Sequence, residues 1–384
     1  MKMIKKFNSE KTKYLKMVNY GLNLFFHTKK SKEKIDWKNV KKILIIDFTG
    51  MGDLVMLLPF LNVVKKNAPK AIIGLACRSY GKELLEEQEV VDHFYIYTKE
   101  QKEKKQVTLT KKIRILKELI RQINCETFDI ALEPKGDLRC IFFMYYCNAR
   151  RKISYNYTGG EGLLTDVVKP SDDVCHLIDE KLYFLKILGC SYCKEDQMPR
   201  LYLTNNQKMQ VKEIIENYDL KNKIVVGIHP GASLEIKQWR GYEKLLEKII
   251  ESYKDLFFLI FEGPGENYVV DKVMETVKRN NVPVIRSRTN IKQYMQYISL
   301  CDVMICNDSS AGHIAAAYGI KTFVIFGPVQ PERAVPYGKK VYAISNNELE
   351  CIPCVSSICM RNNECIISVT VDMVFKEIRK YWNE

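Results

Sequence analysis

The sequence predicts an α/β protein built from two doubly wound, mostly parallel β-sheet units in tandem. Short apolar runs alternate with helical segments, glycine-containing turns follow several of these runs, and the alternation starts again after residue 200. Continuous apolar runs are typical of strands buried on both faces, and parallel strands need helical crossovers. A length of 384 residues is sufficient for two or three domains.

The first series of apolar runs predicts four strands, over residues 42–46, 71–76, 94–97 and 128–132. Helices are expected over 53–67, 81–87 and 110–124, followed by a helix over 176–188. Gly189 comes directly after this last helix, and glycine commonly terminates helices because it adopts left-handed backbone conformations without strain.

The second series predicts five strands, over 223–228, 256–261, 282–285, 303–306 and 322–326, with a helix over 314–318. We therefore expect a basic amphipathic arm (1–40), a Rossmann-like domain (41–200), a linker (201–222), a second Rossmann-like domain (223–350) and a cysteine-rich segment with a C-terminal helix (351–384). Ligands of such sheets bind beyond the carboxyl ends of the strands, so we expect a cleft between the domains to hold the site.

Composition excludes several classes of protein. The chain has 46% hydrophobic and 28% charged residues, with 19 Gly and 12 Pro, which is typical of globular rather than collagen-like or disordered proteins. No apolar run reaches the roughly 18–20 residues that span a bilayer. The N-terminus has no secretory apolar core, so we expect a cytoplasmic location with most of the 13 cysteines as reduced thiols.

The positive charge is concentrated in the arm. Residues 1–42 hold 13 lysines and three acidic residues, so 10 of the 14 net positive charges belong to this segment. This distribution argues against a nucleic-acid-binding body. Lysines mixed with residues such as Tyr14, Leu22 and Phe25 predict peripheral contact with an anionic inner-leaflet membrane surface. A solvated arm and a helix packed on the body are the alternative interpretations.

The turn after the first strand reads Asp47-Phe48-Thr49-Gly50-Met51-Gly52-Asp53-Leu54. Its two glycines allow a tight turn and close approach to a ligand. Asp53 falls at the start of the next helix, where it is a candidate site residue or an ordinary helix N-cap. The turn is no Walker A loop, because no Gly-Lys-Ser/Thr follows it.

Three turns in the second series carry residues suited to an anionic ligand. They contain Gly231-Ala232-Ser233 with Lys237, then Gly263-Pro264-Gly265-Glu266, then Asp308-Ser309-Ser310 with Gly312 and His313. Lys237 can pair with a phosphate as a point charge, and small residues at a helix N-terminus leave free N–H groups for an anion. Glu266 can accept hydrogen bonds from a ribose. His313 could equally be a buried helix histidine.

With these motifs the chain resembles glycosyltransferase family 9, the heptosyltransferases of lipopolysaccharide core assembly. In the first half the resemblance rests on Ile45-Ile46, Gly52-Asp53, Leu58-Pro59, Gly136, Arg139, Ala149-Arg150-Arg151, His176 and Leu188-Gly189. In the second half it rests on His229 to Ser233, Lys237, Trp239, the Glu266 turn, Asn307-Asp308-Ser309, His313, Ala315 to Ala317, Phe326-Gly327-Pro328, Pro331 and Pro336-Tyr337-Gly338. It spans about residues 41 to 379.

The resemblance implies a GT-B fold, with two Rossmann-like domains facing a cleft, and inverting sugar transfer without a catalytic metal. By position, Asp53 is similar to the family's general base. Lys237 and the Ser309 helix N-terminus are similar to the diphosphate clamp, and Glu266 to the ribose contact. The donor site would also include Gly231, Ala232, Ser233, Asp308, Ser310, Gly312 and His313, and the acceptor site Thr49, Gly50, Gly52, Lys135 and Arg139.

The chain departs from the family pattern at four positions. Asp47 stands where a basic residue is frequent, Ser310 replaces a usual glycine, and Lys135 and Asp137 replace a usual Gln and Asn. The resemblance implies ADP-heptose as donor and a lipopolysaccharide core or other glycolipid as acceptor. A different nucleotide sugar, a protein acceptor of the autotransporter type, and a catalytically idle GT-B binding protein are the alternatives.

Four cysteines cluster near the C-terminus. Cys351, Cys354, Cys359 and Cys365 are separated by two, four and five residues. Four thiolates this close can form a tetrahedral site for zinc or iron, and a reduced compartment favours metal over disulfides. The sequence therefore predicts a structural metal site without a role in the chemistry. Four unligated thiols are the alternative.

Overall fold

The computed structural model describes residues 19, 21–23, 25–31, 33–98, 108–346, 349–354 and 358–382. The chain divides into two compact units, Met1–Gln197 and Met198–Glu384. Each unit contains a six-stranded sheet in which every pair of neighbouring strands is parallel. The predicted α/β class with two doubly wound parallel sheets is confirmed.

The strands of the first unit are β1 Lys42–Ile46, β2 Ile72–Arg78, β3 His93–Tyr97, β4 Phe128–Glu133, β5 Ala149–Tyr155 and β6 Asp166–Val168. Its helices are α2 Met51–Val55, α3 Leu58–Asn67, α4 Ser79–Leu85, α5 Leu109–Ile123, α6 Leu138–Tyr145 and α7 Leu177–Ile187. The strand order is β3-β2-β1-β4-β5-β6.

The strands of the second unit are β7 Ile224–His229, β8 Leu256–Phe261, β9 Val284–Ser287, β10 Val303–Asn307, β11 Lys321–Ile325 and β12 Val341–Ile344. Its helices are α8 Asn205–Asn217, α9 Tyr242–Ser252, α10 Asn267–Arg279, α11 Ile291–Ser299, α12 Ser310–Ala317, α13 Pro331–Ala334, α14 Glu364–Ile367 and α15 Val371–Tyr381. The order is β12-β11-β10-β7-β8-β9, the same as in the first unit when read from β9.

In both units the chain starts in the middle of the sheet, builds outward in one direction, and then returns to build in the other. The strand order therefore reverses between β1 and β4, and again between β7 and β10. At such switch points the loops that leave two neighbouring strands diverge, and ligands of doubly wound sheets bind there.

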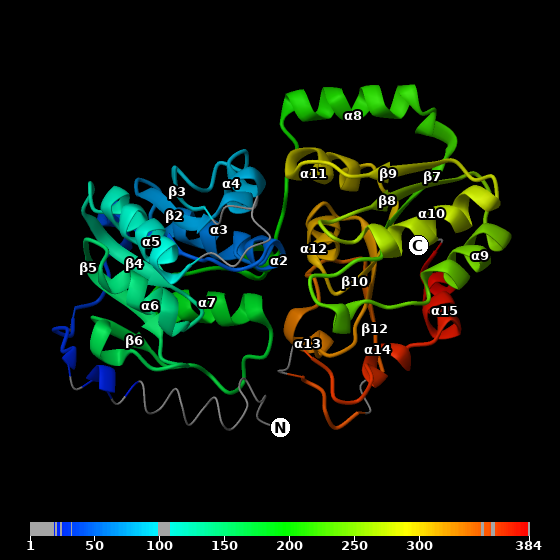
Figure 1. The fold of residues 1–384 in the computed structure, drawn as a ribbon. Helices are drawn as coiled ribbons and strands as arrows, with labels where there is room; N and C mark the ends of the chain where they lie inside the picture. The colour runs from blue at the N-terminus through cyan, green and yellow to red at the C-terminus, as the bar shows by residue number, and fades with distance from the viewer. Residues whose placement is uncertain are drawn as a thin grey trace. The chain divides into compact units, whose positions relative to one another are not determined.

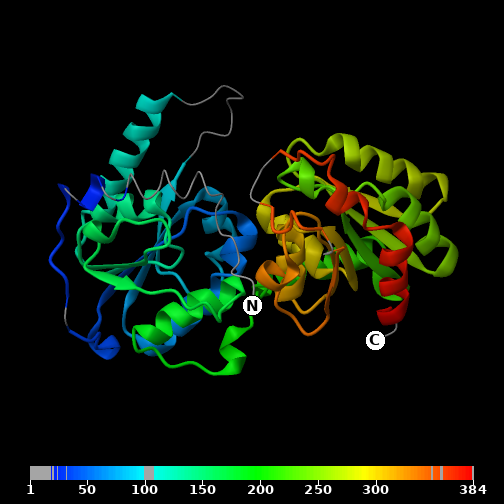
Figure 2. The same cartoon turned by 90° about the horizontal axis from the view of Figure 1, so that it is seen from below.

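Helices cover both faces of each sheet (Figures 1 and 2). In the first unit α5 and α6 pack on one face, and α3 and α7 contact each other on the other face. In the second unit α9, α10 and α15 bury one face of the sheet. Helices α11 and α12 pack together on the opposite face. The cores are aliphatic and aromatic, as the apolar runs predict.

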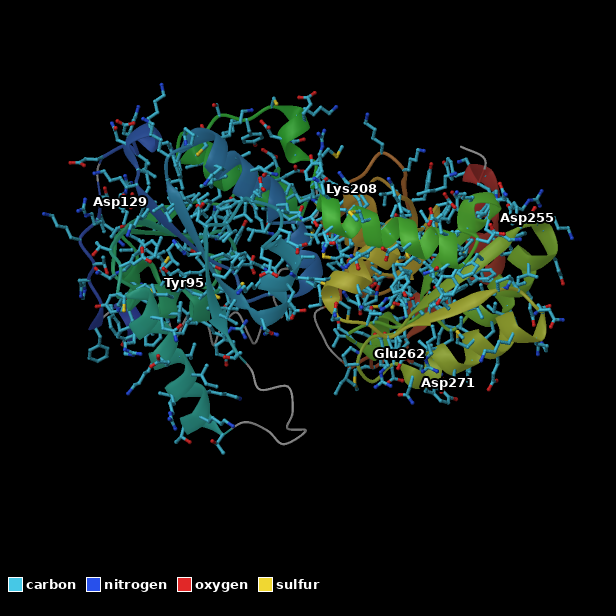
Figure 3. The ribbon with its side chains drawn as sticks, turned by 90° about the horizontal axis from the view of Figure 1, so that it is seen from above. Tyr95, Asp129, Lys208, Asp255, Glu262 and Asp271 are labelled. Carbon is cyan, nitrogen blue, oxygen red and sulfur yellow. The ribbon has the colours of Figure 1, made fainter. Side chains whose placement is uncertain are left out.

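One aspartate in each unit fastens the strands beside the switch point. The Asp129 carboxylate, labelled in Figure 3, accepts hydrogen bonds from the backbone N–H groups of Lys41 (2.8 Å) and Lys42 (3.1 Å) at the start of β1. Asp302 accepts one from Val225 at the start of β7 (2.8 Å). These bonds help to set the register of the strands that carry the functional loops.

The nine predicted strands all occur, each within two residues of its expected ends. The helix expected over 53–67 is instead two helices, because α3 begins with Pro59 in its first turn, where proline is favoured. The helix expected over 314–318 begins four residues earlier, at Ser310. Residues 201–222, expected as a linker, include α8.

The described part of the arm packs on the first unit. The ring of Phe26 contacts those of Phe142 and Tyr145, while the Asn19 side chain accepts a hydrogen bond from Gly160 N (2.7 Å). Phe25 is 82% exposed. Residues 1–18, 20, 24 and 32, which carry part of the predicted amphipathic pattern, lie outside the described residues. Within the part of the chain that is described, none of the helices has the length and apolarity that a bilayer span requires.

Candidate functional site

In each unit, predicted site residues lie in the segments that follow the two strands flanking the switch point. In the first unit, Asp53 follows β1 and Lys135 follows β4. In the second unit, Lys237 follows β7 and Asp308 follows β10. The topology therefore brings together residues that are 82 positions apart in the first unit and 71 in the second.

Asp53 is the third residue of α2 and is 29% exposed. The N-cap of this helix is Gly50, so the interpretation of Asp53 as an ordinary N-cap is wrong. One carboxylate oxygen of Asp53 lies 3.3 Å from the ammonium nitrogen of Lys135. Burial alone would lower the pKa of Lys135, but the charge of Asp53 and its hydrogen bond outweigh burial and raise it. An ammonium beside a carboxylate favours the charged form of both groups.

The glycines of the β1 turn have ordinary backbone conformations. Gly50 has φ of −72° and Gly52 lies inside α2, so neither supplies the left-handed turn that glycine favours. Thr49 is held beside them, because its backbone N–H and hydroxyl both donate to Asp47. The left-handed glycine of this site is Gly136 after β4, with φ of +68°.

Three buried ionisable groups surround this turn, and sequence reasoning assigned none of them to the site. Asp47, Glu133 and Lys181 are each 1% exposed. Glu133 accepts hydrogen bonds from Gly136 N (2.6 Å) and Ser154 Oγ (2.7 Å), and burial raises its pKa to about 7. Lys181 lies on the inward face of α7, where its apolar neighbours could have indicated burial but not its function.

Lys181 and Asp47 each have a buried polar atom that makes no hydrogen bond to the described residues. Among the described residues, Nζ of Lys181 and Oδ2 of Asp47 have no hydrogen-bond partner. Burial lowers the pKa of Lys181, and the charge of Lys135 lowers it further, against the opposing charges of Asp47 and Asp53. The side chains of Asp47, Asp53, Lys135 and Lys181 thus interact electrostatically around the β1 turn.

Arg139, a predicted acceptor residue, folds back on its own helix. Its guanidinium is 90% exposed and pairs with Asp137 (2.5 Å). Asp137 is also the N-cap of α6, accepting from Arg139 N (2.9 Å). The structure therefore brings Lys135, but not Arg139, into contact with Asp53.

In the second unit Lys237, a predicted clamp residue, forms an ion pair with Asp308, a predicted donor-site residue. The Lys237 ammonium lies 2.6 Å from Oδ2 of Asp308, and both side chains are largely buried. Lys237 ends a short helical turn, Glu235–Lys237, that follows the Gly231 loop. Because a lysine carries three N–H donors, this ammonium can bind a second anion while it remains paired.

Asn307, at the end of β10, organises the loops around this pair. Its amide donates to the carbonyls of Pro230 (2.8 Å) and Gly231 (3.0 Å). Its carbonyl oxygen accepts from Trp239 N (3.2 Å). The indole of Trp239 in turn donates to the Val369 carbonyl (2.7 Å). Asn307 is fully buried. The sequence motif contains this residue but did not indicate that its side chain holds the neighbouring loops together.

Glu266 is packed against Gly231. A Cβ atom on Gly231 would lie 1.9–2.3 Å from the carboxyl atoms of Glu266, so a larger residue there would displace the Glu266 side chain. Glu266 Oε2 also accepts a hydrogen bond from Gly263 N (2.7 Å) and lies 3.3 Å from Nε2 of His229. Nδ1 of His229 lies 3.1 Å from the hydroxyl of Ser309.

The remaining predicted donor residues lie on the same loops and on α12. Ser309 is the N-cap of α12, Ser310 opens the helix, and His313 is 5% exposed within it. Gly312 packs against β10 and β11, since a Cβ there would meet Cys306 at 3.0 Å. Ala232 is buried, whereas Ser233 is exposed.

The four clustered cysteines lie near one another. Burial raises the pKa of Cys365, and the charges of Cys351, Cys359 and Cys354 raise it further, which indicates their proximity. Cys359 Sγ accepts hydrogen bonds from two backbone N–H groups, of Arg361 (3.3 Å) and Asn363 (3.2 Å). Among the described residues, however, no three His, Cys, Asp or Glu side chains are arranged to hold a metal ion.

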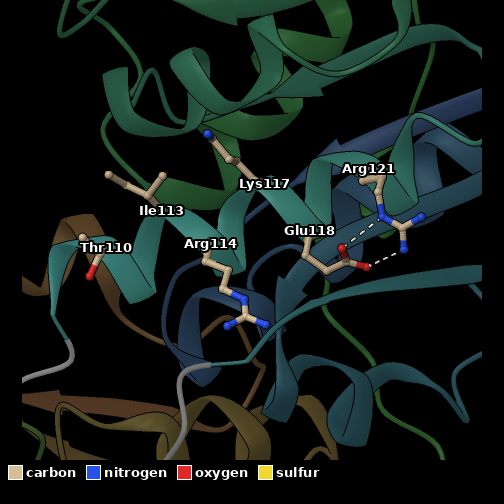
Figure 4. Close-up of a pocket in the computed structure, with 6 residues that line it drawn as sticks. All are labelled: Thr110, Ile113, Arg114, Lys117, Glu118 and Arg121. Atoms are coloured by element: carbon tan, nitrogen blue, oxygen red, sulfur yellow. Dashed lines mark hydrogen bonds and ion pairs between the residues drawn. The ribbon is translucent and has the colours of Figure 1, made fainter.

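A surface groove of about 580 Å³ lies away from these loops, along α5 (Figure 4). It is lined by Thr110, Ile113, Arg114, Lys117, Glu118 and Arg121. Glu118 and Arg121 form an ion pair with each other (2.8 Å). All six residues belong to one helix, so the groove is the outer surface of α5 and coincides with none of the predicted site residues.

Comparison with known proteins identifies a family and a fold. The family described as "Glycosyltransferase family 9 (heptosyltransferase)" matches residues 116–364. Lipooligosaccharide heptosyltransferase 2 of Campylobacter jejuni subsp. jejuni serotype O:6 is 31% identical over 168 residues, 42% of this chain and 52% of the relative. The chain thus spans about half the length of this curated relative.

Two solved structures share the fold. The glycosyl transferase family 9 protein from Veillonella parvula has a TM-score of 0.73 at 17% identity, covering 91% of this chain and 98% of its own. The E. coli ADP-heptose lps heptosyltransferase II has a TM-score of 0.70 at 17% identity, covering 88% and 98%. At these identities the likeness concerns the fold.

Proposed function

The chain belongs to glycosyltransferase family 9, and from that premise we propose that it is an inverting glycosyltransferase. Its donor would be a nucleotide diphosphate sugar, ADP-heptose in the first instance, and its acceptor a lipopolysaccharide core or another glycolipid. The observation that carries this proposal is the pairing of charged residues at both switch points, Asp53 with Lys135 and Lys237 with Asp308.

Asp53 is suited to act as the general base. As the new C–O bond forms at the anomeric carbon, the acceptor hydroxyl becomes acidic and its proton passes to the Asp53 carboxylate. Lys135, 3.3 Å away, favours the charged form that can accept this proton. Attack opposite the departing diphosphate inverts the configuration at the anomeric carbon.

The second unit offers the positive charge that the leaving group needs. When the bond from the anomeric carbon to the diphosphate oxygen breaks, negative charge grows on the nucleoside diphosphate. The Lys237 ammonium and the N–H groups of the first turn of α12, with Ser309 and Ser310, would stabilise that charge. Glu266 would bind the ribose hydroxyls, and Asp308 and His313 the sugar and phosphates.

A thermal-shift screen against nucleotide sugars tests the donor. A ligand at about 100 times its Kd stabilises the native state by about 2.7 kcal/mol, enough to raise the melting temperature measurably. We expect a rise with ADP-heptose. A rise with a different nucleotide sugar alone would replace the donor, and no rise with any of them would favour an idle binding protein.

Two further proposals concern the ends of the chain. The basic arm would contact an anionic membrane surface, and removing residues 1–36 should then weaken binding to vesicles that contain anionic lipid. The cysteines Cys351, Cys354, Cys359 and Cys365 would hold a structural zinc or iron ion. The chemistry of four thiols suits such a metal, and the two N–H···S bonds to Cys359 are of the kind that stabilise a thiolate ligand.

A further inference from the structure

His229 connects two residues of the proposed nucleotide site that come from different loops. Its Nδ1 lies 3.1 Å from the hydroxyl oxygen of Ser309, and its Nε2 lies 3.3 Å from Oε2 of Glu266. The ring is largely buried, which holds it in this geometry. It closes β7, while Ser309 follows β10 and Glu266 follows β8, so three neighbouring strand ends meet through one imidazole.

The chemistry of the partners determines where the protons lie. An ionised carboxylate only accepts hydrogen bonds, so Nε2 of His229 must carry the hydrogen that faces Glu266. Burial alone would raise the pKa of Glu266, but the hydrogen bonds that it accepts from His229 and from the Gly263 N–H favour its ionised form and lower the pKa. In the neutral ring Nδ1 is then an acceptor, and the Ser309 hydroxyl must donate to it.

This arrangement limits what Ser309 can offer a ligand. A hydroxyl has a single hydrogen, and one committed to Nδ1 cannot also be donated to a phosphate oxygen. If the ring takes up a proton, Nδ1–H donates to the Ser309 oxygen, and the hydroxyl hydrogen becomes available to the ligand. The imidazolium that results still faces the Glu266 carboxylate and gains a charge-assisted hydrogen bond.

We propose that His229 is a positioning residue that takes up a proton from the solvent when a nucleoside diphosphate binds at Ser309. The proton released by the buffer acid enters at Nδ1, the Ser309 hydroxyl turns toward the phosphate, and the ring stays fixed on Glu266. This inference rests on the proposed function, because Ser309 and Glu266 are taken as phosphate and ribose contacts.

Among the described residues, Glu266 is the charged group that faces the His229 ring. Neutral groups adjoin His229 on three further elements: Tyr294 of α11 contacts its ring, Tyr242 of α9 donates to its carbonyl, and Cys306 of β10 is its strand partner. Burial raises the pKa of each of these three groups, so they stay protonated. The nearby charges of Lys237 and Asp308 are paired with each other at 2.6 Å.

Calorimetry of ADP binding tests the proposal. Titrations at about pH 8 in buffers of different ionisation enthalpy give the number of protons taken up per ADP bound. We expect the wild type to take up close to one proton more than His229→Gln, whose side chain can still donate to Glu266 but cannot titrate. The difference between variants removes any protons exchanged by the phosphates themselves. Adenosine, which has no phosphate, should bind the wild type without this uptake.

Two further variants separate positioning from a general structural effect. Ser309→Ala keeps the ring and should lose the same proton uptake, with ADP affinity lower by about tenfold. His229→Asn is too short to reach Glu266 and should weaken adenosine as well as ADP, whereas His229→Gln should weaken ADP alone.

Equal proton uptake in the wild type, His229→Gln and Ser309→Ala would overturn the inference while the proposed function stands. Failure of the wild type to bind ADP would remove the proposed donor and this inference with it. Should His229→Gln not fold, as judged by circular dichroism, Ser309→Ala decides the outcome.

Discussion

The ammonium nitrogen of Lys135 lies 3.3 Å from Oδ1 of Asp53, and this ion pair links the loops after β4 and β1. The pair gives this chain a counter-charge next to its proposed base, and this charge has measurable consequences.

Asp53→Asn should reduce sugar transfer by about 10²–10⁴-fold, because the amide cannot accept the proton of the acceptor hydroxyl. Donor binding should be kept, since Asp53 and the donor residues belong to different units. Initial rates and the ADP-heptose-induced rise in melting temperature measure the two effects. Asp196→Asn, which removes a surface carboxylate paired with Lys66 (2.7 Å), is the matched control. Undiminished transfer by Asp53→Asn would remove Asp53 from the role of base.

Lys135→Met should move the acid limb of the kcat/KM profile to higher pH. Removing the adjacent ammonium disfavours the charged carboxylate, so a higher pH is needed before Asp53 can accept a proton. Lys135→Arg keeps the positive charge and should leave the limb close to its wild-type position. A pH–rate profile of the three proteins makes the comparison, and identical acid limbs would mean that Lys135 does not act on the base.

Glu133 should make the first unit less stable as the pH rises. Its folded-state pKa is about 7 against an ordinary value of 4.5, so between these values the native state keeps a proton that the unfolded chain has lost. Stability is therefore full below about pH 4.5 and falls until about pH 7, by about 3 kcal/mol. Glu133→Gln keeps an acceptor for Gly136 N and Ser154 Oγ and should remove this part of the pH dependence. Urea unfolding at several pH values measures it, and an unchanged slope in the variant would contradict the assignment.

Gly231→Ala should weaken nucleotide binding without unfolding the chain. The added Cβ would overlap the Glu266 carboxyl group at 1.9–2.3 Å, so that side chain must leave its place against the loop. We expect ADP affinity to fall about tenfold, the value of one hydrogen bond to a charged group. In a Glu266→Ala background the same substitution should have little further effect, because the clash is gone. An equal loss in both backgrounds would show that Glu266 is not the cause.

Elemental analysis of the purified chain tests the cysteine cluster. If the four thiols hold a metal, we expect about one zinc or iron per chain, lost in Cys359→Ser together with part of the thermal stability. Cys193→Ser, at an exposed cysteine outside the cluster, should keep the metal. A folded wild type free of metal would leave four unligated thiols.

Much of the fold could be predicted from sequence because buried parallel strands are continuous apolar runs. The strands that were missed lack such runs. β5 contains Arg150, Arg151 and Lys152, which an interior strand rarely carries, and β6 has three residues. β12 lies at a sheet edge and is only partly buried. Edge position and short length remove the signal that identified the other nine.

The site could be predicted as a set of motifs but not as a set of contacts. The resemblance pointed to Asp53, Lys237, Glu266 and Ser309 because each matches a motif position of the family. It could not indicate that Asn307 holds the Gly231 loop, since a buried amide in a motif looks like any other polar residue. The burial of Lys181 depends on how α7 packs, which helical periodicity alone does not determine.

Trp239 gives the C-terminal tail an unexpected relevance to nucleotide chemistry. The backbone N–H of Trp239 donates to Asn307, and its indole donates to the carbonyl of Val369. Val369 lies 130 positions further along the chain, so the C-terminal tail supports the segment from Lys237 to Trp239. A protein truncated before residue 369, or a chimaera that carries the tail of a relative, would therefore lose or change the contact that supports the proposed donor loop. Fragment design for this chain should therefore keep the tail together with the proposed donor loop.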